Sequence, residues 1–168
     1  EIGAGLGLRA APSESSGGTV YTVDGDHLWE FDTRTETSRD LGGLTVGAED
    51  YITSIDLDPK TERYLYFVAG SHGGSYRDGA PLVQYDLQGG SRKVIAFLHP
   101  FCEQRFGFTP MGTYATAVSP LGDKVYITWH GNRGGPDPKR NKLSFNTCAL
   151  TVVHVPASER AAAGQQAD

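Results

Sequence analysis

A hydrophobic–Tyr–hydrophobic strand occurs three times in this sequence, and such a repeat leaves few folds open to the chain. The Tyr-containing strands lie at 19–23, 65–68 and 125–128. A second apolar strand follows each of them, at 28–32, 82–86 and 150–154. A strand that ends in proline precedes each of them, at 8–12, 55–59 and 115–120. Short strands at 37–41 and 91–95 complete the first two units, whereas the third unit stops after its third strand.

The repeating unit is therefore four short strands, and its spacing is typical of the blades of a β-propeller. Pro12, Pro59 and Pro120 recur at intervals of 47 and 61 residues, near the roughly 40–50 residues of a blade. We expect three blades at about 2–41, 51–98 and 113–155, a partial propeller over 1–156, and a polar tail at 157–168. A propeller needs at least about four blades, so the sequence predicts an all-β segment of a larger ring of about six to eight blades.

The third unit lacks its outer strand, and this predicts a partner. We expect another chain or segment to supply that strand and the remaining blades. The chain starts at Glu1 without a Met or a signal peptide, which is typical of a mature, processed or partial chain.

Composition agrees with an all-β protein and excludes some partners. The 22 glycines and nine prolines separate short apolar runs, as in a fold with many turns. A net charge of −5 argues against a nucleic-acid partner, because phosphate binding needs clustered Lys and Arg. No apolar run approaches the roughly 20 residues that span a bilayer.

Several segments resemble the repeats of known bacterial propellers. Val20–Asp24 with Phe31–Asp32, and Lys124–Thr128, resemble the YVTN-type repeat of bacterial and archaeal surface or periplasmic propellers. Asp32-Thr33-Arg34-Thr35 resembles the D-x-x-T turn of quinoproteins and lactonase-like propellers. The likeness is to a blade and implies a fold rather than an activity. The Trp-Asp pair of WD repeats, the kelch Gly-Gly and the quinoprotein Trp are all missing, so no subfamily is indicated.

The long connections are expected on one face of the propeller. Strand direction alternates within a blade, which places the segments 69–80, 99–112 and 129–147 together and the short turns on the opposite face. Binding and catalytic residues concentrate on such loops. Cys102 and Cys148 both lie in these connections, where they form either a disulfide, our prediction, or two free thiols. A disulfide would imply an oxidising compartment, and hence a periplasmic or secreted protein.

Three groups of residues in these connections are candidates for ligand binding. His72, Tyr76, Arg77 and Asp78 could supply a base, a stacking ring, an anion contact and a carboxylate, or Arg77 and Asp78 could simply hold an ordered loop. Trp129, His130 and Arg133 could bind a sugar acid or phosphate, although Trp129 could equally close a buried strand. His99 and Arg105 lie in the loop between the second and third blades.

A metal site is a weaker hypothesis. His72, His99 and His130 map to one face and could hold a divalent ion with an open position, but no short ligand spacing supports them. Asp32 and Asp86 recur with the repeat, and we predict that they accept hydrogen bonds from turn N–H groups.

The sequence favours a binding or assembly module outside the cytoplasm, with a protein or glycan ligand on the loop-rich face. The alternative is part of a propeller enzyme, a polysaccharide lyase or a lactonase-like hydrolase with a metal-assisted site at the channel mouth. No G-x-S-x-G, P-loop or H-E-x-x-H motif is present, so no catalytic residue is assigned and the question of an enzyme stays open.

Overall fold

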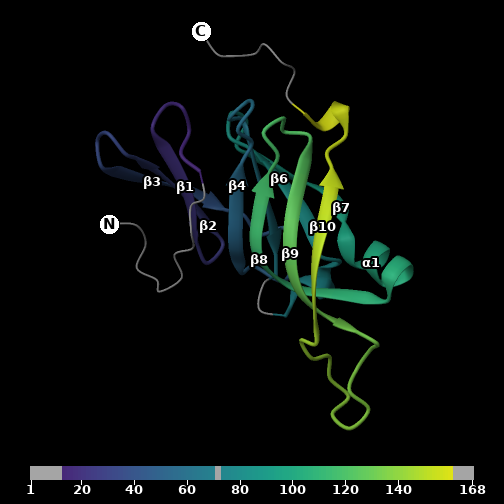
Figure 1. The fold of residues 1–168 in the computed structure, drawn as a ribbon. Helices are drawn as coiled ribbons and strands as arrows, with labels where there is room; N and C mark the ends of the chain where they lie inside the picture. Colours follow the sequence, from purple (N-terminus) through teal and green to yellow (C-terminus); the bar gives the residue numbers. More distant parts are fainter. Residues whose placement is uncertain (1–12, 71–72, 161–168) are drawn as a thin grey trace.

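A computed structural model describes residues 13–70 and 73–160, which form three antiparallel sheets (Figure 1). The first sheet has the order β1-β2-β3, the second β4-β5-β6-β7 and the third β10-β9-β8. The strands are β1 (Thr19–Asp24), β2 (His27–Asp32), β3 (Thr37–Gly43), β4 (Ile52–Leu57), β5 (Tyr64–Ala69), β6 (Pro81–Asp86), β7 (Ser91–Phe97), β8 (Phe108–Val118), β9 (Lys124–Arg133) and β10 (Thr147–His154).

Each sheet is a meander of sequential strands, so the predicted fold class, part of a β-propeller, is confirmed. The second sheet has all four expected strands. Within the described residues the third sheet ends at β10 without an outer strand, as the repeat predicts. The strand expected at 8–12 lies outside the described residues.

Two hydrophobic layers separate the three sheets, and β5 contributes to both. Leu65 and Phe67 belong to the core shared with the first sheet. Tyr66 and Val68 belong to the core shared with the third sheet. Because side chains alternate across a strand, a strand buried on both faces reads as a continuous apolar run. This explains why the middle blade has the most hydrophobic version of the repeat.

The inner strands β4 and β8 are joined by side chains of β4. The Val118 N–H donates to Asp56 Oδ2 at 2.7 Å, and the Thr116 N–H donates to Ser54 Oγ at 2.5 Å. Asp56 and Ser54 are both buried. Neighbouring blades therefore lock together near the axis through polar side chains on backbone groups, in addition to apolar packing.

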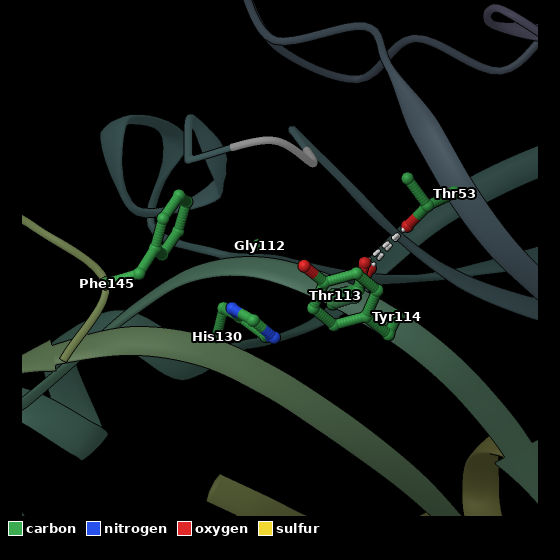
Figure 2. Close-up of a pocket in the computed structure, with 6 residues that line it drawn as sticks. All are labelled: Thr53, Gly112, Thr113, Tyr114, His130 and Phe145. Atoms are coloured by element: carbon green, nitrogen blue, oxygen red, sulfur yellow. Dashed lines mark hydrogen bonds between the residues drawn. The ribbon is translucent and has the colours of Figure 1, made fainter. Parts of the chain in front are cut away.

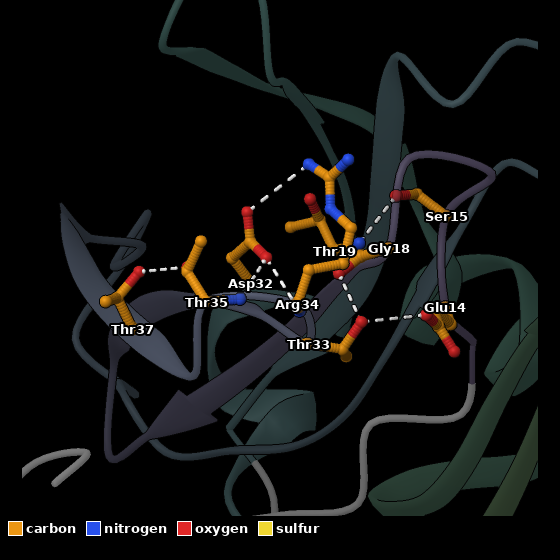
Figure 3. A network of polar contacts seen from close by, with 9 residues as sticks. All are labelled: Glu14, Ser15, Gly18, Thr19, Asp32, Thr33, Arg34, Thr35 and Thr37. Atoms are coloured by element: carbon orange, nitrogen blue, oxygen red, sulfur yellow. Dashed lines mark hydrogen bonds and ion pairs between the residues drawn. The ribbon is translucent and has the colours of Figure 1, made fainter.

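The Asp residues at the ends of the third strands hold the turns, as predicted. Asp32 Oδ1 accepts the N–H groups of Thr35 at 3.0 Å and Arg34 at 2.8 Å (Figure 3). These backbone bonds hold the pKa of Asp32 below its usual range. Asp86 makes the equivalent bonds with its own turn and also pairs with Arg63, whose side chain is the main cause of its lowered pKa.

Two segments predicted to be loops are partly regular structure, so these two predictions were wrong in part. Most of 99–112 is the helix α1 (Leu98–Phe106) and the start of β8, not a loop. Gly107 ends the helix at φ 58°, and its N–H bonds Cys102 O and Glu103 O, a left-handed cap that favours glycine. The predicted loop 129–147 is also shorter, because β9 continues to Arg133.

The long connections still gather at one end of the sheets. Figure 1 shows the β9–β10 connection projecting below the third sheet, with α1 on the same side and the β8–β9 turn at the opposite end. No helix of the described residues is long and apolar enough to cross a membrane.

Candidate functional site

A small pocket opens at the loop-rich end of the inner strands (Figure 2). Its volume is about 60 Å³, so a ligand larger than a few atoms would lie over its rim rather than inside it. The residues that line it come from β4, β8, β9 and the β9–β10 connection: Thr53, Gly112, Thr113, Tyr114, His130 and Phe145.

Three aromatic rings dominate this pocket, which we call the aromatic pocket. The centroids of Tyr114 and His130 are 4.1 Å apart, with the planes at 62°. His130 and Phe145 are 5.5 Å apart at 80°. Tyr114 is 65% exposed and Phe145 53% exposed, so both rings still offer surface to a ligand. Edge-to-face packing of this kind fixes the rings relative to one another.

The base of the β9–β10 connection positions Phe145. Asn146 Oδ1 accepts the Arg133 N–H at 2.8 Å, and Asn146 Nδ2 donates to Arg133 O at 3.0 Å. Asn132 Nδ2 donates to Ser144 O at 2.9 Å. The two asparagines thus hold the residues on either side of Phe145 against the end of β9. On its other side, Phe145 lies over Gly73 of the second blade, where a Cβ would stand 3.3 Å from its ring.

Hydrogen bonds also anchor the floor of the pocket. Thr53 Oγ1 donates to Thr113 O at 2.7 Å, which ties β4 to β8 next to Tyr114 (Figure 2). Gly131 follows His130, and a Cβ there would meet Phe108 and Thr109 O at 2.4 Å. Only glycine allows β8 and β9 to approach so closely at this point. The rings therefore stand on a rigid support.

Trp129 takes no part in this surface. It is 1% exposed, and its Nε1 donates to Thr151 Oγ1 at 2.8 Å within the core between the second and third sheets. Trp129, His130 and Arg133 were predicted together as ligand-binding candidates. Only His130 lines the pocket, while Arg133 is exposed at the end of β9. Neighbours in a strand point to opposite faces, which is why Trp129 and His130 separate.

In the second-blade loop, the described candidates hold the loop itself. Arg77 Nη1 donates to Glu49 Oε1 at 2.7 Å, and this bond is the main cause of the raised pKa of Arg77. Asp78 Oδ2 accepts the Glu49 N–H at 2.8 Å. Tyr76 packs edge-on against His99, with the centroids 5.8 Å apart. These contacts match the structural interpretation, in which Arg77 and Asp78 order the loop.

The remaining candidates are dispersed. His99 is in α1, where its Nε2 lies 4.0 Å from Glu103 Oε2, whereas His130 is in the aromatic pocket. Arg105 is exposed near the end of α1, and His72 lies outside the described residues. The described part of the chain holds no group of three or more His, Cys, Asp or Glu side chains arranged for a metal ion.

The predicted Cys102–Cys148 disulfide is not confirmed, because both residues are free cysteines. Cys102 is 1% exposed and packs in the hydrophobic core beneath α1. Burial raises the pKa of its thiol. Cys148 is exposed on β10, opposite His130 on β9. The helix that replaces the expected loop turns Cys102 inward, so the disulfide gives no support for an oxidising compartment.

Comparisons with known proteins place the chain among propellers and leave its family open. No protein-family model matches the sequence, and no curated protein matches it. An auxiliary nutrient binding protein from Bacteroides thetaiotaomicron is similar in structure, with a TM-score of 0.50 and 13% identity over 85% of this chain. An oligogalacturonate lyase from Vibrio parahaemolyticus has a TM-score of 0.51 and 14% identity over 88%. The Swd1 β-propeller domain from Myceliophteria thermophila has a TM-score of 0.51 and 17% identity over 94%.

These likenesses show the fold alone. The chain spans 31% of the nutrient binding protein, 37% of the lyase and 42% of the Swd1 domain chain. It therefore corresponds to part of each propeller.

Two of the three rings of the pocket, Tyr114 and Phe145, were not among the residues predicted from the sequence. Tyr114 directly precedes the inner strand expected at 115–120, and Phe145 lies in a connection whose candidate residues were chosen from its other side chains. An aromatic residue within a long polar loop was the available signal for Phe145. No local spacing joins residues 114, 130 and 145, because the pairing of β8 with β9 and the fold of the β9–β10 connection bring them together.

Proposed function

We propose that this chain is a binding and assembly segment of a β-propeller, and that its aromatic pocket binds a glycan. The observation that carries the proposal is the cluster of Tyr114, His130 and Phe145 on a rigid floor at the loop-rich end. Exposed rings next to hydroxyl groups suit sugars, whose apolar faces stack on aromatic side chains while their hydroxyls hydrogen-bond.

The shallow volume of the pocket supports surface binding. About 60 Å³ is too small to enclose a sugar ring, so a glycan would lie across Tyr114 and Phe145. Such a site binds by stacking area and needs no catalytic group. We assign no catalytic residue, and the enzyme alternative has no described residue that specifically favours it.

Calorimetric titration of the purified chain with a panel of oligosaccharides tests the site. Tyr114→Ala should weaken binding about two- to tenfold, by analogy with the loss of an aromatic stacking contact of about 0.5–1.5 kcal/mol, whereas Tyr114→Phe should keep most of the affinity. Phe106→Ala is the matched control, because Phe106 is 54% exposed and lies outside the pocket. Equal losses in the Tyr114→Ala and Phe106→Ala variants would contradict the proposed site.

The assembly part of the proposal concerns the open face of the third sheet. In the second sheet, Tyr66 pairs with Gln84, and both are covered, at 1% and 3% exposure. At the equivalent register in the third sheet, Tyr126 pairs with Val152, which is 46% exposed. Leu150, two residues away on the same face, is 62% exposed. The repeat therefore presents a blade-packing face, and we propose that a further blade from another chain or segment covers it.

Intact mass spectrometry of gently isolated native material tests this assembly. We expect either a co-purifying chain with further blades, which the Leu150→Lys/Val152→Lys variant should lose, or a covalent extension with further blades, which that variant should keep. Both substituted positions are solvent-exposed in the described structure, so the variant should retain the circular dichroism spectrum of the native chain. A stable, monodisperse 168-residue monomer would contradict the proposal. We also propose that the protein lies outside the cytoplasm, which cell fractionation would test.

A further inference from the structure

Positive charge is concentrated in the third blade. The sequence has eight Lys and Arg against 15 Asp and Glu in residues 1–98, but six against three in residues 99–155. Four of the six cations, residues 133, 139, 140 and 142, belong to the end of β9 and the connection that follows it. We call residues 133–146 the basic finger; it projects from the loop-rich end of the third sheet (Figure 1).

The basic finger brings together four cations with little neutralisation by nearby carboxylates. In the first two blades Arg39, Arg63 and Arg77 lie within 2.8 Å of a carboxylate oxygen. Among the described residues, no carboxylate lies within 4.0 Å of the Arg133, Lys139 or Lys142 side-chain nitrogens, and Arg140 reaches Asp137 only at 3.9 Å. The finger thus carries positive charge that the rest of the described chain leaves unneutralised.

The finger is an ordered hairpin rather than a loose loop. Asp137 and Lys142 form a β-bridge, and Asp137 Oδ1 accepts the Lys139 N–H at 2.8 Å. The Asn141 N–H donates to Asp137 O at 2.8 Å. These bonds use backbone groups of Lys139 and Lys142, so their ammonium groups stay available at an exposed tip. A fixed backbone lowers the entropic cost of presenting those charges to a ligand.

The same hairpin supplies Phe145 to the aromatic pocket. One element therefore joins the Phe145 ring at its base to exposed cations toward its end. We propose that the ligand of the loop-rich face is an acidic glycan, which stacks on Tyr114 and Phe145 while its carboxylate or sulfate groups pair with the basic finger. This inference rests on the proposed function and adds the charge class of the ligand.

The charge distribution favours an acidic glycan over a nucleic acid. Double-stranded DNA carries one charge per about 1.7 Å of axis and needs an extended basic track. Here the basic region is short, and residues 1–98 of the adjoining blades carry a surplus of seven carboxylates, which would repel a dense polyanion beyond the finger. A less densely charged polymer can place a few acidic groups on the finger and avoid most of this repulsion.

Matched acidic and neutral glycans provide the test: polygalacturonate with its methyl ester, and carboxymethyl-cellulose with hydroxyethyl-cellulose. Titration of the purified chain, with any chain that co-purifies, should give at least about tenfold tighter binding to the acidic member of a pair. Raising the ionic strength from 0.01 to 0.15 M shortens the screening length from about 30 to about 8 Å. This change should remove much of the difference between acidic and neutral glycans.

Substitutions in the basic finger test whether its cations cause the tighter binding of acidic glycans. Lys139→Gln and Lys142→Gln should each weaken acidic-glycan binding about threefold, and together about tenfold, as expected for exposed ion pairs. Lys60→Gln is the matched control, because Lys60 is exposed on a turn at the other end of the second sheet. It should change nothing.

Each outcome decides a different claim. Equal binding of the acidic and neutral members would overturn this inference and leave glycan binding intact. No binding to any member would overturn the proposed function and this inference together. Tighter binding to oligouridylate than to every glycan would replace the acidic glycan with a nucleic acid. Loss of binding in Lys60→Gln equal to that in Lys139→Gln would remove the finger from the site.

Discussion

Asp56 offers the sharpest test of how two blades hold together. Asp56 is 6% exposed, and its carboxylate accepts three hydrogen bonds: from the Val118 N–H at 2.7 Å, the Ser13 hydroxyl at 2.9 Å and the Leu57 N–H at 3.0 Å. Only the bond from Val118 crosses to the third sheet. Asp56→Ala therefore removes a link between β4 and β8. It also leaves the three donors without the carboxylate that accepts their hydrogen bonds.

The expected cost follows from those bonds. A buried donor left unpaired costs about 1–3 kcal/mol, and each net hydrogen bond about 1 kcal/mol. We expect Asp56→Ala to lower the free energy of unfolding by about 3 kcal/mol, and Asp56→Asn, which keeps one acceptor oxygen, by about 1–2 kcal/mol. Urea titration followed by circular dichroism measures both values. Asp50→Ala is the control, because Asp50 is exposed and should cost less than about 0.5 kcal/mol.

The pH dependence of the free energy of unfolding provides a second test of Asp56. Burial raises the pKa of Asp56 above its usual 3.8, while the bonds from Val118, Ser13 and Leu57 act in the opposite direction. Because the folded chain then holds this proton more tightly than the unfolded chain, the stability contributed by Asp56 falls as the pH rises from 3.8 through the raised pKa. The Asp56→Asn variant should lack this decline. A cost for Asp56→Ala no greater than for Asp50→Ala would refute the role of this link.

Two further predictions concern the cysteines and Asp123. A thiol reagent should modify the exposed Cys148 within minutes in the native chain and reach the buried Cys102 only after denaturation; no modification before reduction would instead indicate a disulfide. The Ser119 hydroxyl, followed by Lys124, lowers the pKa of Asp123 from its usual 3.8 to about 2, so its contribution to stability is present above pH 3.8 and is lost as the pH falls toward 2. Asp123→Asn should flatten this part of an acid titration of stability, and an unchanged acid limb would contradict the assigned pKa.

Helix α1 illustrates why part of the fold was not predictable. The sequence analysis expected 99–112 as a connection between two blades, and this segment contains Pro100. Proline is nevertheless tolerated in the first turn of a helix, where its missing N–H has no partner to lose. Leu98 and Cys102, four residues apart, then bury one side of the helix. Nine residues form too short a helix to be stable by propensity alone, so packing against the sheet decides it.

The sequence by itself determined the blades of this protein. Alternating apolar residues, recurrent turn residues and a repeated Tyr specify the order and approximate limits of the strands, because strand period and turn chemistry are local properties. The turn roles of Asp32 and Asp86 followed for the same reason. The missing outer strand of the third blade was also visible in the sequence, since a repeat shows where a unit stops.

Only the tertiary structure decided the site. Tyr114, His130 and Phe145 meet through the pairing of β8 with β9 and the anchoring of the basic finger by Asn132 and Asn146. The burial of Trp129 and of Cys102 likewise depends on which face of an element meets a neighbouring sheet. Contacts between residues distant in sequence are determined by packing, and no local pattern in a single chain records them.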